Sequence, residues 1–224
     1  IARKDGTSYP ELVEKIRRTM QTTLDTGTFS TNRGLRSAED IVTNGRWKTQ
    51  FETGKSSGSY DPLYRKGIER KMFGYALDVP DEARPVYGYV RHPKPPHSMK
   101  NTHYGSVRFD LRDGIRDRAT VTWGDSFGTG WDTFQPSPAR SVSPGSRMLQ
   151  QGKPTVGAVG PADGRDHGYT EVQYNGGLRM EDVVRVTFHP SERPTQTIIE
   201  SLESQGFHEV AADAGAGEWR VWAR

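Results

Sequence analysis

The segment Gly168-Tyr-Thr-Glu-Val-Gln-Tyr-Asn-Gly-Gly-Leu-Arg-Met-Glu-Asp-Val-Val-Arg-Val-Thr-Phe188 predicts two β-strands joined by a turn. Polar and apolar side chains alternate over residues 169–174, as they do in a strand. Asn175-Gly176-Gly177 ends this strand, because Asn and Gly enter left-handed backbone conformations at low cost. Glu171 is unusual, since a carboxylate is disfavoured among aromatic and β-branched strand residues. It either faces water or an arginine, or it serves a ligand.

The composition indicates a small core and long connections. Only 32% of the 224 residues are hydrophobic, Gly and Pro number 25 and 14, and the mean hydropathy is −0.81. The net charge of +3 is compatible with an anionic ligand or nucleic acid without indicating either. We expect no membrane segment, because no apolar run approaches the roughly 18 residues that a spanning helix needs. The absence of cysteine excludes disulfides and thiolate sites. Ile rather than Met at position 1 suggests an excised fragment.

Local patterns predict an α+β fold made of early helices, five or six antiparallel strands and a late helix. We expect one domain over residues 1–224, with residues 1–27 as a helical lead-in. Residues 134–166 are rich in Pro, Gly and Ser, which predicts a mobile loop able to act as a lid. Helices are predicted at 9–23, 37–45, 62–73 and 195–205. The main strands are predicted at 84–90, 103–111, 118–123, 169–174 and 184–188, and further short strands at 28–31, 207–210 and 218–222.

Residues 46–60 form a polar segment with glycines, hydroxyl side chains and basic residues at both ends. Loops of this kind can hold phosphate through backbone N–H groups and hydroxyls. The segment lacks the Gly-Lys-Ser/Thr ending of a P-loop and the strand–turn–helix context of a dinucleotide fingerprint. A solvated surface loop is an equally good interpretation.

Other polar positions have both a structural and a functional interpretation. Gly88 interrupts a predicted strand between two tyrosines, which often marks close approach of a backbone or a ligand. Asp125 and Ser126 follow another strand and are common turn formers. The basic segment Arg91–Lys100 is expected to be irregular. His92, His97 and His103 lack metal-ligand spacing, so we expect no metal site.

Five ordered blocks resemble a bacterial domain family of unknown function over residues 37–188. They are Arg46-Trp-Lys-Thr-Gln-Phe-Glu-Thr-Gly-Lys-Ser-Ser-Gly58, Arg84-Pro-Val-Tyr-Gly88, Tyr104-Gly-Ser-Val-Arg-Phe109, Arg118-Ala-Thr-Val-Thr-Trp-Gly-Asp-Ser126 and Tyr169-Thr-Glu-Val-Gln173. The closing block is similar to the last catalytic strand of ADP-ribosyltransferases, where a Glu contacts the ribose of NAD. The chain departs from that pattern, because a Ser-Thr-Ser strand is missing and the motif is Glu171-x-Gln173. The pattern does not identify the Arg or His that binds NAD.

The resemblance implies a split antiparallel β core and an NAD-dependent ADP-ribosyltransferase, in the glycosyltransferase class. Such an enzyme transfers ADP-ribose to protein or nucleic acid, or hydrolyses NAD. Glu171 and Gln173 would be catalytic, NAD would be the substrate, and no metal would be needed. Arg46 and Lys55, or Arg108, would add charge for the diphosphate. The residues expected to bind NAD are Gln50, Phe51, Thr53, Gly54, Ser57, Arg84, Tyr87, Gly88, Tyr104, Gly105, Ser106, Asp125 and Ser126.

The same resemblance implies a bacterial toxin or effector module, secreted or injected into a target cell and acting in its cytoplasm. A cognate immunity protein would then be a partner, besides the macromolecular acceptor. Two alternatives remain open at this point. One is a non-catalytic nucleic-acid-binding module that uses Arg91–Lys100, and the other is a nuclease with His92, His97 or His103 as general base.

Overall fold

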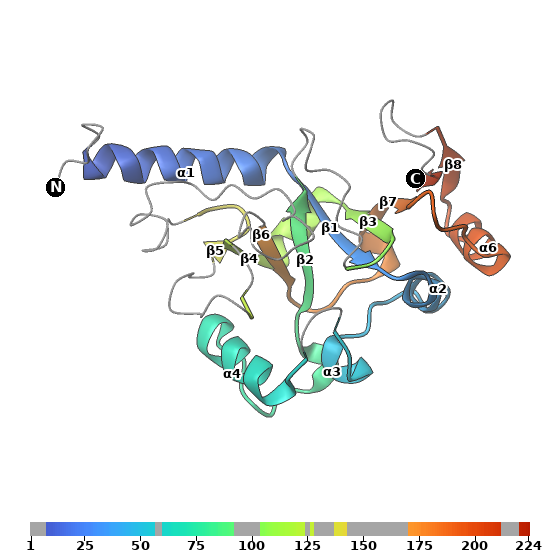
Figure 1. Ribbon diagram of the computed structural model, residues 1–224, viewed down its shortest axis with the longest axis horizontal. Helices are drawn as coiled ribbons and strands as arrows, with labels where there is room; N and C mark the ends of the chain where they lie inside the picture. The colour runs from blue at the N-terminus through green and yellow to red at the C-terminus, as the bar shows by residue number, and fades with distance from the viewer. Residues whose placement is uncertain are drawn as a thin grey trace.

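The computed structural model describes residues 8–56, 60–91, 104–123, 126–127, 137–142, 170–211 and 220–224. Its centre is a nine-stranded antiparallel sheet with the order β5-β4-β6-β2-β1-β3-β7-β9-β8 (Figure 1). The strands are β1 Thr28–Arg33, β2 Val86–Arg91, β3 Val107–Leu111, β4 Ala119–Trp123, β5 Ser137–Pro138, β6 Thr170–Tyr174, β7 Val183–Phe188, β8 His208–Val210 and β9 Arg220–Ala223.

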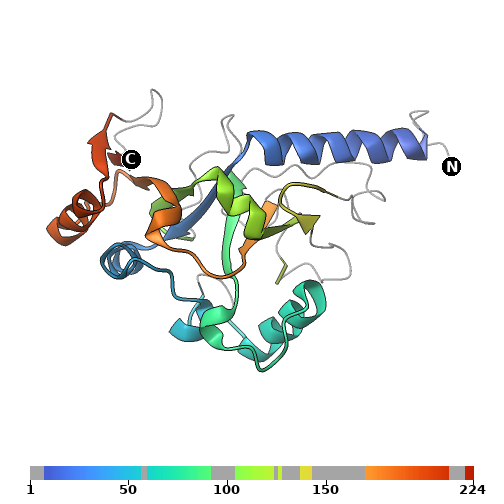
Figure 2. The same ribbon diagram turned by 180° about the vertical axis from the view of Figure 1, so that it is seen from behind.

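The helices lie around this sheet. Figures 1 and 2 show α1 on one side and α3 and α4 on the other, while α2 packs against α6 near β7. None of the described helices combines the length and hydropathy needed to cross a membrane. The helices are α1 Tyr9–Thr26, α2 Leu35–Asn44, α3 Gln50–Thr53, α4 Pro62–Phe73 and α6 Gln196–Ser204, with the 3₁₀ helices η1 Asp81–Ala83, η3 Asp113–Arg118 and η4 Met180–Asp182.

One face of the sheet is apolar, and the opposite face carries a buried polar row. Val90, Phe109 and Val172 belong to the hydrophobic core, together with the apolar stripe of α1. Because paired residues of neighbouring strands share a face, the register aligns Thr122, Glu171, Tyr89, Ser30 and Asp110 across five strands. All five are buried. Buried polar groups need hydrogen-bond partners, so we expect the side chains of this row to take part in a hydrogen-bonded network.

The sheet opens between β1 and β2. Their pairing runs only from Thr28↔Arg91 to Ser30↔Tyr89. Beyond Ser30, β1 continues to Arg33 alongside β3 alone, and β2 begins at Val86 alongside β6 alone. A side chain bridges the gap, since Thr31 Oγ1 donates to the Tyr87 carbonyl at 3.1 Å. The sheet is continuous over its nine strands, and the pairing of β1 with β2 ends after Ser30 and Tyr89.

The turn after β6 is anchored by a buried carboxylate. Asp182 is almost fully buried and accepts hydrogen bonds from the Arg179 N–H, from Arg112 at 3.0 Å and from Arg118 at 2.5 Å. Burial acts to raise the pKa of Asp182, but these donors outweigh it and hold the pKa below its ordinary value. The contacts join η4 to both ends of η3.

Most predicted elements are confirmed, with ends shifted by a few residues. The α+β class is confirmed, whereas the sheet has more strands than expected. A capping box formed by Ser8 and Glu11 starts α1. Within the predicted loop 134–166, residues 137–138 form β5 against β4, and most of the rest lies outside the described residues. Similarly, residues 46–60 contain the single-turn helix α3.

The buried side of α4 is not purely apolar. Leu63, at the start of the helix, is 82% exposed although its side chain is apolar. The helix instead buries Arg65 and Glu69 together with Ile68. Arg65 and Glu69 are four residues apart, so they lie on one side of the helix. The inner surface of α4 is therefore mainly polar: Arg65 lines a cavity, and Glu69 pairs with Arg84.

Candidate functional site

A cavity of about 740 Å³ lies where β1 and β2 diverge. Consecutive residues of both strands line it, namely 31–33 of β1 and 86–89 of β2. Further lining comes from α2, from residues 48–56, from Arg65 of α4, and from Tyr104 and Phe127. Glu171 is the residue of β6 that reaches this cavity. Its volume lies within the range of about 300–1,000 Å³ that is usual for sites that enclose small molecules.

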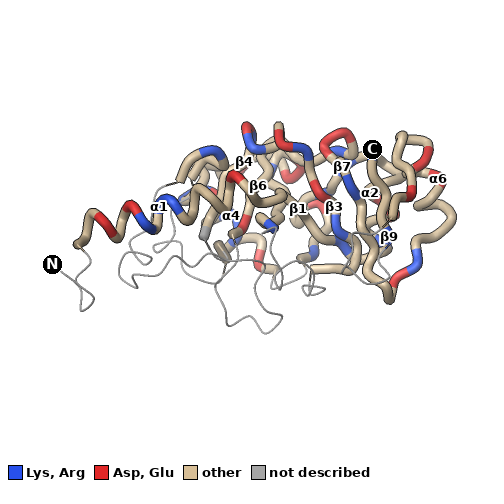
Figure 3. The backbone as a smooth tube through the Cα atoms, turned by 90° about the horizontal axis from the view of Figure 1, so that it is seen from above, with Lys and Arg blue, Asp and Glu red and all other residues tan. Residues whose placement is uncertain are grey.

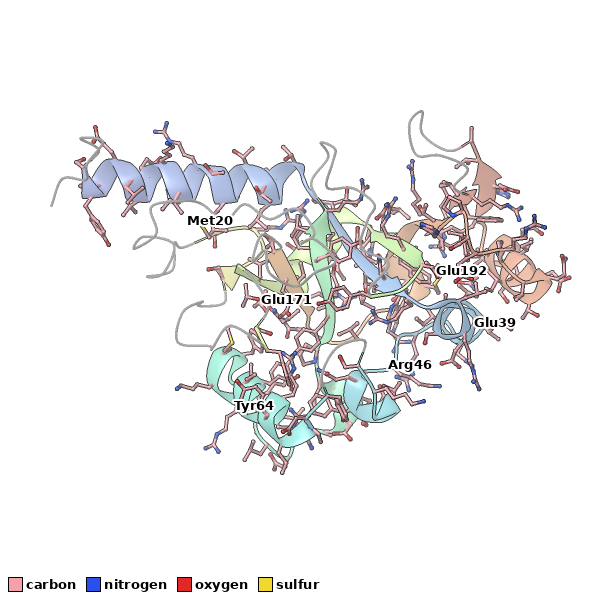
Figure 4. The ribbon with its side chains drawn as sticks, viewed as in Figure 1. Met20, Glu39, Arg46, Tyr64, Glu171 and Glu192 are labelled. Atoms are coloured by element: carbon pink, nitrogen blue, oxygen red, sulfur yellow. The ribbon has the colours of Figure 1, made fainter. Side chains whose placement is uncertain are left out.

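Glu171 is held rigidly at the centre of the sheet (Figure 4). Its strand β6 is hydrogen-bonded to β2 on one side and to β4 on the other. The Glu171 side chain is buried, and its Oε1 accepts hydrogen bonds from Ser126 Oγ and from Gln173 Nε2, the latter at 2.7 Å. Donors to a carboxylate favour its ionised form and fix its orientation. The cavity therefore contains a carboxylate that is placed with precision.

Gln173 supports Glu171 and does not line the cavity. The side chain is fully buried. Its Nε2 also donates to Thr122 Oγ1 at 3.1 Å, and its Oε1 accepts from Thr120 at 3.0 Å. With these contacts to β4 in place, Gln173 orients the neighbouring carboxylate. Direct contact between Gln173 and a ligand, which we expected from the sequence, does not follow from its position.

Arg65 and Phe127 belong to the site but were not identified from the sequence. The guanidinium of Arg65 donates to Ser126 Oγ at 2.9 Å. It lies over the ring of Tyr87 at 4.6 Å and over the ring of Phe127 at 4.8 Å. The available signal was weak, because Arg65 is one basic residue among several on α4. Only its spacing from Glu69 indicated a polar inner side.

Tyr87 is fixed by a buried ion pair. Its hydroxyl donates to Glu69 Oε1 at 2.7 Å, and Arg84 Nη1 donates to Glu69 Oε2, also at 2.7 Å. Arg84 and Glu69 are completely buried. Burial raises the pKa of Glu69, and it raises the pKa of Tyr87 well above the usual value for a phenol. Arg84, which was expected to bind NAD, does not line this cavity.

The charges around the cavity suit an anion. Cationic lining residues outnumber anionic ones. Asp40 and the lining cation Lys48 neutralise each other at 2.9 Å, whereas Glu52 is neutralised at 2.7 Å by Arg46, which does not line the cavity. Arg33 donates to a hydroxyl and a carbonyl oxygen. Burial lowers its pKa to about 10, so it stays charged at neutral pH. The lining cations are Arg33, Arg36, Lys48, Lys55 and Arg65.

Several residues expected to bind NAD do line this cavity: Gln50, Thr53, Tyr87, Gly88 and Tyr104. Within the described part of the chain, Gln50 Nε2 is buried and has no hydrogen-bond partner. Such orphaned donors are uncommon in folded proteins. Gly88 also serves packing, because a Cβ there would lie 2.3 Å from the Ser30 carbonyl oxygen.

Other predicted site residues lie elsewhere. The ring of Phe51 packs against the Arg84 guanidinium, with 4.8 Å between Arg84 Cζ and the ring centroid. Gly54 ends α3 in a left-handed backbone conformation. Gly105 has φ +119°, and a Cβ there would lie 2.1 Å from the backbone carbonyl carbon of Arg33. The Ser106 carbonyl accepts from the His189 N–H. Ser126 lies beneath Glu171 and does not line the cavity, whereas Ser57 and Asp125 fall outside the described residues.

The described residues contain no group of three or more His, Asp or Glu side chains suited to a metal ion. His92, His97 and His103 lie outside the described residues, so the structure does not bear on the nuclease alternative. Of the basic segment Arg91–Lys100, only Arg91 is described, at the end of β2.

Comparison with known proteins gives relatives without a described activity. Residues 28–133 match the model of a family described as "Protein of unknown function (DUF3626)". The chain is 28% identical over 183 residues to the Gene 2 protein of Mycobacterium phage L5. It is 26% identical over 185 residues to the Gene 2 protein of Mycobacterium phage D29. Each match covers 75% of this chain and 66% of the relative. The family match covers β1 to β4 but ends before Glu171.

Proposed function

We propose that this chain is an NAD-dependent ADP-ribosyltransferase that transfers ADP-ribose to a macromolecule or, with water as acceptor, hydrolyses NAD. The observation that carries the proposal is Glu171, a buried carboxylate fixed by two donors and lining a cavity rich in cations. The ADP-ribosyltransferase type of β core is part of the same proposal. It is supported by the divergence of β1 and β2 beside the strand that carries Glu171.

A fixed carboxylate can accelerate cleavage of the bond between nicotinamide and ribose in NAD. The bond between the nicotinamide nitrogen and ribose C1′ breaks, and nicotinamide leaves with the electron pair. Positive charge then develops on the ribose, as in the oxocarbenium-like transition states of glycosidases. A nucleophile of the acceptor, or water, attacks C1′ and releases a proton. The Glu171 carboxylate stabilises charge that grows in the transition state, which accelerates the reaction.

The lining also suits the rest of NAD. Arg33 and Arg36 lie beside the start of α2, whose N-cap Gly34 offers no side-chain hydrogen bond. The first N–H groups of a helix attract anions, so this end of the cavity suits the diphosphate better than Arg84 does. Tyr87 and Tyr104 offer aromatic surface for the nicotinamide. One face of the Tyr87 ring is covered by Arg65, which leaves stacking to Tyr104 or to the opposite face of Tyr87.

A dual-label experiment tests the proposal. The protein is incubated with cell lysate and NAD that carries one label on nicotinamide and another on ADP-ribose. We expect release of free nicotinamide, with the second label on protein, on nucleic acid or in free ADP-ribose. The Glu171→Gln protein should be nearly inactive, whereas Glu181→Gln, a control at an exposed carboxylate of η4, should be active. Intact NAD after incubation with folded wild-type protein contradicts the proposal.

The bacterial toxin or effector context, with delivery into a target cell and a cognate immunity protein, belongs to the same proposal and rests on the sequence resemblance. The nucleic-acid-binding alternative gains no separate support from the described residues. Acidic and basic residues are interspersed along the described backbone (Figure 3). Binding to RNA or DNA that weakens steeply with salt, without NAD consumption, is the outcome that favours it.

A further inference from the structure

We propose that Arg65 is a positioning residue of this enzyme, which acts on Glu171 through the hydroxyl of Ser126. The inference rests on the proposed function of Glu171 and adds a role for α4, a helix that neither the sequence motifs nor the comparisons connect with the reaction. Arg65 would set the geometry of the carboxylate without taking part in the chemical step.

The three side chains form one hydrogen-bonded chain. Arg65 Nη1 donates to Ser126 Oγ at 2.9 Å, and Ser126 Oγ donates to Glu171 Oε1. All three side chains are buried, so water competes little for these bonds. The chain connects α4, the segment after β4, and β6, which are 61 and 45 residues apart in the sequence.

Arg65, which only donates, and the ionised Glu171 carboxylate, which only accepts, together determine the direction of this chain. A guanidinium is a donor only, whereas a hydroxyl both donates and accepts. With Arg65 donating, the Ser126 oxygen acts as an acceptor towards α4 and its hydrogen points to Glu171. The hydrogen-bonded cation also polarises the hydroxyl and strengthens its bond to the carboxylate. An uncharged or misplaced side chain at position 65 would remove this polarisation and leave the Ser126 oxygen without its donor from α4.

The position of Arg65 is itself well defined. Its guanidinium lies over two aromatic rings, those of Tyr87 and Phe127, at 4.6 and 4.8 Å. Glu69, four residues further along α4, accepts from the Tyr87 hydroxyl. The planar guanidinium of arginine can stack on an aromatic ring while its N–H groups donate hydrogen bonds in a fixed geometry, which a lysine ammonium cannot reproduce. Lysine would keep the charge but lose this geometry, and it therefore separates the two contributions.

A second role competes with this one, because Arg65 also lines the cavity and could bind the substrate directly. Among the described residues, Tyr89 of β2 pairs with Glu171 in the register, Tyr87 of β2 interacts with it electrostatically, and Arg65 of α4 reaches it through Ser126. A positioning role affects turnover and its pH dependence, whereas direct binding affects KM. The experiment must therefore measure both.

The test compares Arg65→Ala, Arg65→Lys, Ser126→Ala and the double variant Arg65→Ala/Ser126→Ala, with Arg70→Ala as control on the exposed side of α4. We expect Arg65→Ala and Ser126→Ala each to lower kcat for nicotinamide release about 10- to 100-fold, with KM for NAD changed less than about threefold. The acidic limb of the kcat profile should move to higher pH in both, because a carboxylate that loses donors binds its proton more readily. The double variant should be no worse than the worse single one, since both residues act through one chain. The kcat of Arg65→Lys should be close to that of Arg65→Ala, because lysine keeps the charge but not the geometry of the guanidinium.

A raised KM with unchanged kcat, or additive losses in the double variant, overturns the proposal. A readout independent of NAD separates this failure from failure of the proposed function. The carboxyl carbon resonance of Glu171, assigned by comparison with Glu171→Gln, is titrated in wild type, Arg65→Ala and Arg70→Ala. A midpoint that rises in Arg65→Ala alone supports the hydrogen-bonded chain even if NAD is not the substrate. An unchanged midpoint in folded Arg65→Ala refutes it. Ser126→Ala gives the same comparison should Arg65→Ala fail to fold.

Discussion

Replacing Glu171 by glutamine removes one negative charge while it keeps the shape of the side chain. The amide oxygen can still accept hydrogen bonds from Ser126 and Gln173, so the fold should persist. The carboxylate is 5% exposed, which makes an effective dielectric constant of about 20 more suitable than that of water. Two unit charges about 4 Å apart then interact by about 4 kcal/mol. Each 1.36 kcal/mol changes the rate about tenfold, and the amide dipole retains part of the interaction. We therefore expect kcat to fall about 100- to 1,000-fold.

The assay is release of nicotinamide from NAD at saturating concentration, and NAD binding is measured by calorimetry on the same samples. The dissociation constant for NAD should change less than about tenfold, because the lost interaction is strongest in the transition state. Glu181→Gln is the matched control, as it makes the same chemical change at an exposed position of η4. Turnover by Glu171→Gln within tenfold of wild type, with a normal melting temperature, would refute the assignment.

Three further predictions concern stability and are measured by urea unfolding. Gly88→Ala should destabilise the protein by about 3 kcal/mol, because its Cβ would lie 2.3 Å from a carbonyl oxygen of β1. Gly67→Ala, in open space on α4, should stabilise the protein by about 0.5–1 kcal/mol. Equal changes in the free energy of unfolding for the two variants would contradict this contrast. Glu69→Gln should cost about 3–5 kcal/mol, since it leaves the Arg84 cation buried without its counter-charge, and a loss below about 1 kcal/mol would show that the pair is dispensable. Asp182 has a lowered pKa, so its contribution is present above its ordinary pKa of about 4 and is lost as the pH falls below that value. Asp182→Asn should therefore be less stable at pH 7 and lose less stability between pH 7 and pH 3 than wild type, and parallel pH curves would disprove this linkage.

Local sequence signals located most of the elements. The capping box at Ser8 and the glycine after Asn44 set the ends of α1 and α2, because caps and breakers act within one helical turn. Alternation in β6 and β7 predicted the strands on both sides of Asn175-Gly-Gly177. The two-residue strand β5, Ser137–Pro138, was missed, because two residues are too few to show a periodic pattern.

The candidate site was predicted only in part, for a physical reason that α4 illustrates. An amphipathic helix is normally oriented by its apolar stripe. In α4, Arg65 and Glu69 face inward because they find buried partners on other segments, and Leu63 is left exposed. The local pattern contains no information about those partners. The same holds for Arg84, which resembles a ligand residue in the sequence and is neutralised internally by Glu69.

The sequence by itself determined which segments become helices and strands, and it singled out Glu171 as a carboxylate out of place in a strand. Both follow from interactions between near neighbours in the chain. Only the tertiary structure decided that β1 and β2 diverge beside β6, that Arg33 and Arg65 reach the resulting cavity, and that Ser126 and Gln173 hold the carboxylate. These features depend on hydrogen bonds and packing between segments far apart in the chain, and no local pattern specifies which distant segments will meet.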